Sequence, residues 1–274
     1  MDEDHHRYQS SDEEDFQPDV FGQRPSQPVF SKPIVLWKDP NTGSARTFKT
    51  LLVGTAFGGS TFLHSLQKKT LIGTLLQPGV DLKDNTLNVD SPFNANGNIY
   101  TLDADPSVAI IPVHYQVKDH DSLFFARTLL DTIKADRIIV LDTLSPSTYL
   151  SGSYDTDYNL PWLRLLKTTG SQDVPQIPTL EVPNLVQNLG AALVSHCEIR
   201  GKKDVFLVLS LQEAIYGKAV TTKATIQGFQ DALAHLGLES VGRAADFNLV
   251  QQILQKSLDK KAGQRRMQDD RLYA

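Results

Sequence analysis

Short apolar segments alternate with helical patterns along the middle of this 274-residue chain, and this alternation restricts the possible folds most. Seven segments have the length and the branched or aromatic residues typical of strands: Ile34–Trp37, Thr50–Thr55, Leu71–Leu76, Ile99–Leu102, Val108–Val113, Arg137–Asp142 and Val205–Ser210. Five segments carry apolar residues at helical spacing: 62–66, 123–133, 183–200, 222–236 and 246–261. The order predicts an α/β fold, a three-layer single domain with a mostly parallel central sheet.

Proline and glycine residues predict where two of these helices begin and end. Pro183 suits a first helical position, because its missing N–H would have no partner there, and Gly201 follows the end of the same helix. Gly237 takes the corresponding place after the helix at 222–236. We therefore expect a third main helix from Pro183 to about Arg200.

Most of the excess acidic charge lies at the N-terminus. Residues 1–15 carry a net charge of −6 and the whole chain −5, so the remaining residues together carry +1. They show no basic stripe interleaved with aromatic residues, which argues against a nucleic-acid-binding surface. Residues 1–33 are also rich in proline and glutamine and can bury little apolar area. We therefore expect a disordered arm at 1–33, before an α/β domain at 34–258.

Cysteine usage and hydropathy indicate the compartment. A single cysteine, Cys197, allows no internal disulfide and is typical of a reducing compartment. No apolar run approaches the roughly 18 residues of a membrane span, and no secretory signal pattern opens the chain. These features predict a cytoplasmic protein, with the nucleus also accessible at this size.

The most enzyme-like stretch is Gly54–Thr61, which follows a predicted strand and opens a predicted helix. Gly54 and Gly59 have the spacing of two glycines in a phosphate-binding P-loop, but Ser60 stands where that loop has its lysine. The Gly-x-Gly-x-x-Gly dinucleotide pattern is not met either. We interpret the stretch as a tight strand-to-helix turn in which glycine allows close packing.

Other candidate catalytic or binding residues are isolated. His196 falls on a predicted helix as a partly buried histidine, and Cys197 beside it as a small core residue. No two histidines within 34–258 have the spacing of metal ligands, so we predict neither a metal nor a cofactor. Asp142 ends a predicted strand, where α/β folds place ligands, and is the best candidate for a small-molecule site.

The chain ends in Leu272, Tyr273 and Ala274, after a polar segment that could bury almost nothing. We expect residues 259–274 to form a flexible tail. A partner can capture a terminal carboxylate with backbone N–H groups or a lysine, and the neighbouring tyrosine offers ring area and a hydroxyl donor. These three residues are therefore the predicted partner-binding site.

Three stretches together resemble the proteasome assembly chaperones. Residues 160–168 read Leu-Pro-Trp-Leu-Arg-Leu-Leu-Lys-Thr, similar to a Leu-Arg-x-Leu-Lys-Thr run in that family. Residues 180–197 contain Leu-Glu-Val-Pro-Asn, Leu-Gly-Ala-Ala and Ser-His-Cys, similar to the family's Leu-Glu-x-Pro-Asn, Leu-x-Ala-Ala and Ser-x-Cys. The last three residues match the family's hydrophobic-Tyr-any-residue tail.

The resemblance implies a chaperone that pairs with a second, related assembly chaperone and sits on the outer face of the α-subunit ring of the 20S proteasome core. The tail would enter a pocket between two α subunits, with the Ala274 carboxylate on a lysine and Tyr273 against the pocket wall. Occupying that surface would block premature binding of regulatory particles. The family's fold is similar to that of purine nucleoside phosphorylases without known catalysis, so the resemblance implies no enzyme.

Two other functions stay open at this stage. One is an enzyme of nucleoside-phosphorylase-like architecture that uses the Gly54–Thr61 turn and Asp142. The other is an ATP-driven proteasome activator, which would share the tail but needs a complete phosphate loop. Ser60 stands where that loop needs a lysine, which argues against the ATP-driven activator.

Overall fold

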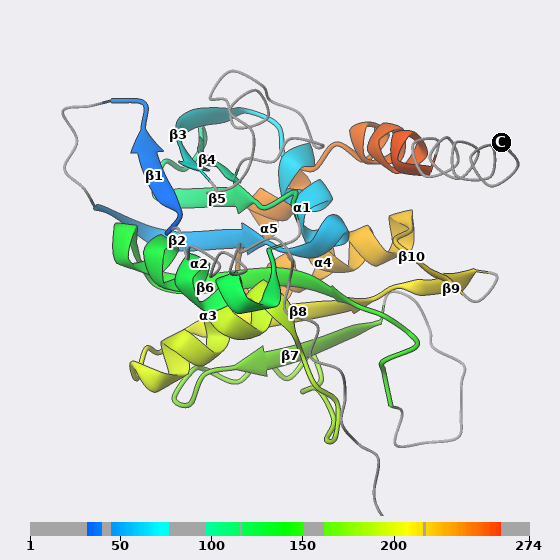
Figure 1. Ribbon diagram of the computed structural model, residues 1–274. Helices are drawn as coiled ribbons and strands as arrows, with labels where there is room; N and C mark the ends of the chain where they lie inside the picture. The colour runs from blue at the N-terminus through cyan, green and yellow to red at the C-terminus, as the bar shows by residue number, and fades with distance from the viewer. Residues whose placement is uncertain are drawn as a thin grey trace, which may run out of the picture. The chain divides into compact units, whose positions relative to one another are not determined.

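A central sheet of eight strands organises the chain in the computed structural model (Figure 1). The structure describes residues 32–39, 45–76, 97–115, 117–150, 162–215 and 218–258. The strands of this sheet are β1 (Ile34–Trp37), β2 (Arg46–Gly54), β3 (Lys69–Leu76), β4 (Gly97–Leu102), β5 (Val108–Pro112), β6 (Ile133–Leu144), β7 (Leu163–Lys167) and β8 (Val205–Leu211). Their order across the sheet is β1-β3-β4-β5-β2-β6-β8-β7.

The four inner strands β5, β2, β6 and β8 are parallel neighbours. Their register places Leu52 of β2 opposite Ile110 of β5 and Ile139 of β6, and all three side chains are fully buried. β4, β3 and β1 extend the sheet with antiparallel pairs, and β7 pairs antiparallel with β8 at the other edge. Five of the eight strands therefore run in one direction, which confirms the predicted α/β fold with a mostly parallel sheet.

Helices cover both faces of this sheet (Figure 1). One face packs against α2 (Asp119–Thr132) and α3 (Asn188–Ile199), and the other against α1 (Ala56–Ser65) and α4 (Lys223–His235). The other elements among the described residues are α5 (Glu239–Arg243), a helix over residues 247–258, and a hairpin of β9 (Glu213–Ile215) and β10 (Lys218–Val220). The result is the expected arrangement of three layers.

Alternate residues of the inner strands supply the two cores on either side of the sheet. Leu51 and Val53 belong to the core under α2 and α3, and Leu52 between them belongs to the core under α1 and α4. In this second core the rings of Phe62 and Phe229 are fully buried, with centroids 5.9 Å apart. Truncating a buried phenylalanine lowers the stability of a protein by about 3–5 kcal/mol. The burial of these two rings against the sheet therefore helps to hold α1 and α4 in place.

Glycines end two helices as predicted. Gly201 after α3 and Gly237 after α4 have φ values of 64° and 75°, in the left-handed region where a side chain is unfavourable. Beyond Gly237, the N–H of Leu238 donates to the carbonyl of Leu233 at 2.7 Å and so closes the last turn of α4. The sequence therefore located both helix ends correctly.

The predicted start of the third main helix at Pro183 is wrong. α3 begins at Asn188, whose left-handed backbone, at φ 60°, prevents the helix from continuing back toward the proline. Residues 181–184 form a turn instead, in which the Asn184 N–H donates to the Glu181 carbonyl at 3.0 Å. Pro183 therefore lies in a loop that long-range contacts hold.

No helix in the described part of the chain combines the length and the apolar character needed to cross a membrane. The predicted tail at 259–274 lies outside the described residues, as does the predicted N-terminal arm apart from residues 32 and 33.

Candidate functional site

The two internal stretches that carry the family resemblance lie side by side in the structure. β7 belongs to the first stretch, and residues 178–180, where the second begins, run along the outer edge of β7. The Leu165 N–H donates to the Pro178 carbonyl at 2.8 Å, and the Leu180 N–H donates to the Leu165 carbonyl at 3.0 Å. The sequence did not predict β7 as a strand, and the chain that follows covers part of its open edge.

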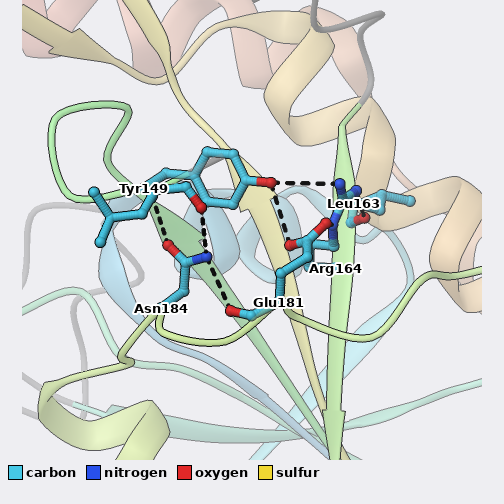
Figure 2. Close-up of polar contacts among 6 residues, drawn as sticks. Tyr149, Leu163, Arg164, Glu181 and Asn184 are labelled. Atoms are coloured by element: carbon cyan, nitrogen blue, oxygen red, sulfur yellow. Dashed lines mark hydrogen bonds and ion pairs between the residues drawn. The ribbon is translucent and has the colours of Figure 1, made fainter. Parts of the chain in front are cut away.

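A polar cluster joins the two stretches through their side chains (Figure 2). Nε of Arg164 lies 2.6 Å from Oε1 of Glu181, and the Tyr149 hydroxyl donates to Oε2 of the same carboxylate at 3.2 Å. The guanidinium of Arg164 also lies over the ring of Trp162, 4.1 Å from its centroid. Tyr149 packs edge-to-face on the same tryptophan, with centroids 4.5 Å apart. Each of the four side chains therefore restrains at least two others.

The charges of this cluster are only partly exposed to water. The side chain of Arg164 is 17% exposed and that of Glu181 is 36% exposed. Burial opposes ionisation of Glu181, but its backbone hydrogen bond and the Arg164 guanidinium hold its pKa below the usual value. Burial raises the pKa of the Tyr149 hydroxyl, so this group remains a donor at neutral pH. Removing Arg164 would leave the carboxylate of Glu181 without its counter-charge.

Asn184 attaches the second stretch to the segment that follows β6 (Figure 2). Its Oδ1 accepts the N–H of Leu150 at 2.7 Å, and its Nδ2 donates to the carbonyls of Leu150 and Glu181, both at 2.9 Å. The side-chain amide therefore pairs with the backbone of Leu150 as a neighbouring strand would. These hydrogen bonds explain why an asparagine suits the last position of the Leu-Glu-Val-Pro-Asn motif.

The joined segments carry exposed apolar side chains. Val182 is 94% exposed, Leu185 76% and Leu150 57%. We call these three residues the apolar surface. Large exposed apolar groups on a rigidly held loop are typical of a protein-docking site, because ordering the loop costs little further entropy on binding.

Asp142 lies at the carboxyl end of β6, in the wall of a cavity of about 570 Å³. Its Oδ1 accepts the N–H of Thr143 at 2.7 Å. Burial raises the pKa of this carboxyl group to about 6, although hydrogen bonds from Thr143 and Thr55 act in the opposite direction. The structure thus places Asp142 near the carboxyl end of a parallel strand, as the sequence predicted, and beside a cavity.

The Gly54–Thr61 stretch is a tight turn from β2 into α1, as predicted. A Cβ on Gly54 would lie 2.4 Å from the carbonyl oxygen of Gly59, and a Cβ on Gly59 would lie 2.0 Å from the carbonyl oxygen of Leu141. The Ser60 hydroxyl donates to a carbonyl one helical turn earlier at 2.7 Å. The glycines therefore allow α1 to pack directly on the sheet.

The remaining predicted residues have different outcomes. Cys197 is 2% exposed, and burial raises its pKa to about 11, as expected for a core residue. His196 is half-buried, and burial lowers its pKa. Among the described residues, no group of three or more potential ligands could hold a metal ion. The predicted partner-binding residues Leu272, Tyr273 and Ala274 lie outside the described residues.

Sequence reasoning missed one buried histidine pair. His64 of α1 and His114 after β5 pack edge-to-face, with ring centroids 5.1 Å apart. Burial, together with the charges of His64 and Lys69, lowers the pKa of His114 to about 3, so its imidazole is neutral. Neither ring nitrogen of His114 has a hydrogen-bond partner among the described residues. No spacing rule links two histidines so far apart in sequence, and only the fold shows the pair.

A family model described as Proteasome assembly chaperone 4 matches residues 79–266. The chain belongs to the proteasome assembly chaperone family. Curated relatives carry the name Proteasome assembly chaperone 1. The Xenopus laevis protein is 24% identical over 169 residues, which cover 61% of this chain and 56% of that protein. The Danio rerio protein is 26% identical over 113 residues, which cover 40% of this chain and 41% of that protein. The chain thus spans about half the length of these relatives, and the predicted resemblance is confirmed.

Solved structures share the fold of this chain. A Thermoplasma acidophilum protein of unknown function has a TM-score of 0.55 at 13% identity, over 85% of this chain and 90% of its own. Pyrococcus furiosus PbaB, described as an archaeal proteasome activator, has a TM-score of 0.51 at 11% identity, over 85% and 99%. PbaA of the same organism, described as an archaeal homolog of proteasome-assembly chaperone, has a TM-score of 0.50 at 11% identity, over 89% and 94%. At these identities the likeness shows the fold alone.

Proposed function

We propose that this protein assists assembly of the 20S proteasome core by binding other proteins, not by catalysis. Membership of the assembly chaperone family supports a role in proteasome assembly. The observation that carries the proposal is the cluster of Arg164, Glu181 and Asn184, which joins both family-like stretches and holds the apolar surface. The residues that resemble the family thus hold an exposed surface in place, which supports a function in binding and not in catalysis.

The apolar surface is the part of the body that we assign to a partner. Val182 and Leu185 flank Asn184, whose hydrogen bonds to Leu150 restrain both before any partner arrives. A preorganised apolar group contributes more to affinity than a mobile one, because less entropy is lost on binding. We infer that the first partner is a second, related assembly chaperone and that the pair binds the outer face of the α-subunit ring.

The C-terminal residues Leu272, Tyr273 and Ala274 supply the second contact in this proposal. Two anchoring groups at a chain end make a small and weak contact on their own. When the α/β domain of the protein docks on the same ring, the tail is held near its pocket at a high effective concentration. The weak contact can then form. Bound in a pocket between α subunits, the tail would block premature binding of regulatory particles. We propose a cytoplasmic location, with the nucleus also accessible.

A catalytic alternative has less support from the geometry. Gly59 of the Gly54–Thr61 turn packs against the Leu141 carbonyl, and the Ser60 hydroxyl is bonded within its own helix. Close packing of α1 on the sheet therefore explains the glycines of this turn, and a bound phosphate is not needed to explain them. Two nucleosidase structures match with a TM-score of only 0.34, which supports no argument for an enzyme.

Co-purification tests the proposal. The full chain with an affinity tag at its N-terminus, so that the C-terminal carboxylate stays free, should recover α subunits and a second assembly chaperone from its own cells. Deleting Leu272–Ala274, or adding one alanine after Ala274, should reduce recovery of α subunits but not of the second chaperone. Unchanged recovery of α subunits from both variants would disprove the role of the tail. Recovery of neither partner by the unmodified chain would disprove the proposed function.

A further inference from the structure

The cavity beside Asp142 lies where the chain leaves the sheet toward opposite faces. From β2 the chain enters α1 on one face, and from the neighbouring β5 it enters α2 on the other. The cavity of about 570 Å³ is lined by residues that follow β2, β5 and β8, by the last residues of β6 and those after it, and by residues 185–189 before and at the start of α3. In open α/β sheets such a crevice at the carboxyl ends of the strands is the usual place for a ligand.

The cavity wall contains polar groups whose hydrogen-bonding capacity is not used within the protein. The Tyr115 hydroxyl and both ring nitrogens of His114 are buried without a hydrogen-bond partner among the described residues. Both residues line the cavity together with the buried carboxyl group of Asp142. Buried polar groups without partners are rare in folded proteins, and several around one cavity indicate that a bound molecule supplies the missing partners.

The charges around the cavity restrict the ligand. None of the residues that line it, all in the described part of the chain, is a lysine or an arginine, and Asp142 is the one acidic residue. A phosphate or carboxylate would therefore meet the carboxylate of Asp142 and no lysine or arginine side chain among these residues. Val113, Leu144 and Leu189 provide apolar wall on which a flat ring can lie.

Gly190, in the first turn of α3, allows this helix to lie close to the carboxyl group of Asp142. A Cβ at this position would come within 2.5 Å of Oδ2 of Asp142. Oδ1 of Asp142 already accepts the Thr143 N–H, and Oδ2 lies beside Gly190. A ligand N–H group that reaches Oδ2 would make a charge-assisted hydrogen bond, stronger than one between neutral groups.

We propose that this cavity binds an uncharged nitrogen heterocycle of nucleoside size, whose ring N–H or amino group donates to Asp142 and whose remaining edge pairs with Tyr115 and His114. Leu185 belongs both to the apolar surface and to the lining of this cavity, but the inference does not depend on the proposed function in proteasome assembly.

Calorimetry and thermal unfolding of the full chain test this inference, with adenosine, guanosine and cytidine as probes and adenosine 5′-monophosphate as a charged control. At least one nucleoside should bind and raise Tm by about 2 °C or more at millimolar concentration. The monophosphate should bind at least about tenfold more weakly than its nucleoside, because its phosphate has no cation to meet.

Variants decide whether binding occurs in this cavity. Asp142→Asn should weaken binding of the nucleoside by about tenfold to a hundredfold, the usual effect of losing a hydrogen bond to a charged group. Exposed Asp136 provides the matched control, and Asp136→Asn should leave binding unchanged. If Asp142→Asn does not fold, Gln187→Trp provides a second test, because Gln187 is an exposed lining residue and an indole there would obstruct the cavity. No binding of any nucleoside, equal binding of the monophosphate, or binding unchanged by both cavity variants would overturn the proposal.

Discussion

Arg164 and Glu181 face each other across the two family-like stretches, with 2.6 Å between Nε and Oε1. Residues 178–180 cover part of the outer edge of the strand that carries Arg164, and Glu181 follows directly after them. The pair therefore links sheet stability to the shape of the loop that displays the apolar surface.

Removing the charge of Arg164 should destabilise the protein. Arg164→Ala leaves the partly buried Glu181 carboxylate without its counter-charge and exposes Trp162, so we expect a loss of about 1–3 kcal/mol in the free energy of unfolding. Urea unfolding followed by tryptophan fluorescence measures this loss. Arg243→Ala is the matched control, because Arg243 and its partner Glu239 are both well exposed. This variant should lower the free energy of unfolding by at most about 0.5 kcal/mol. Equal losses in the two variants would contradict the assigned role.

The amide of Asn184 should protect the backbone of Leu150 from solvent exchange. Asn184→Ala removes the acceptor of the Leu150 N–H, so hydrogen exchange at this amide should become about tenfold faster or more. Asn184→Asp keeps an acceptor oxygen but loses the donor to the Leu150 carbonyl, and it should retain most of the protection. Exchange measured by NMR separates these two results. Equal protection of Leu150 in all three proteins would show that the asparagine does not hold this loop.

The apolar surface should matter for partners more than for folding. Val182→Glu combined with Leu185→Glu places charges on two exposed positions, so the free energy of unfolding should change by less than about 0.5 kcal/mol. Recovery of the second chaperone in co-purification should fall at least about tenfold, since a buried unpaired charge is costly in an interface. Ile199→Glu, at an exposed position on α3, is the control and should leave recovery unchanged. Full recovery with the double variant would exclude this surface as the contact.

Stability should depend on pH through Asp142. Its pKa is raised from 3.8 to about 6 in the folded protein, so between these values the folded state binds more protons than the unfolded state. Stability from this group is therefore complete below about pH 4 and is lost as pH rises through about 6. Relative to the unmodified protein, Asp142→Asn should gain about 2–3 kcal/mol between pH 4 and pH 7.5. Urea unfolding of both proteins across this range measures the difference, and a difference independent of pH would contradict the buried, ionisable carboxyl group.

Several features of the fold followed from local sequence. The inner strands were recognised because branched apolar residues in short runs suit a sheet buried on both faces, although β2 and β6 are longer than predicted. The glycines after α3 and α4 were recognised because a left-handed residue at a helix end depends only on a few neighbours. Pro183 misled the prediction, because its preference for a first helical position is weaker than the contacts that Asn184 makes with Leu150.

The candidate site was predictable only in part. Asp142 was found because the carboxyl end of a parallel strand is a general position for ligands. β7 was missed, because Leu163–Lys167 is a short edge strand whose mixed pattern of burial gives no clear alternation. The exposure of Val182 and Leu185 was missed as well, since a helical pattern through 183–200 would have buried Leu185.

The sequence by itself determined the α/β class, the three-layer arrangement and the glycine helix ends, because side-chain periodicity and backbone preference act over a few residues. It also identified the family through short stretches of matching residues. Only the tertiary structure decided that β7 and residues 178–184 form one cluster, that the apolar surface is exposed, and that His114 and Tyr115 share a cavity wall with Asp142. These relationships join residues far apart along the chain, and their energies depend on distances and burial that exist only after the sheet has assembled.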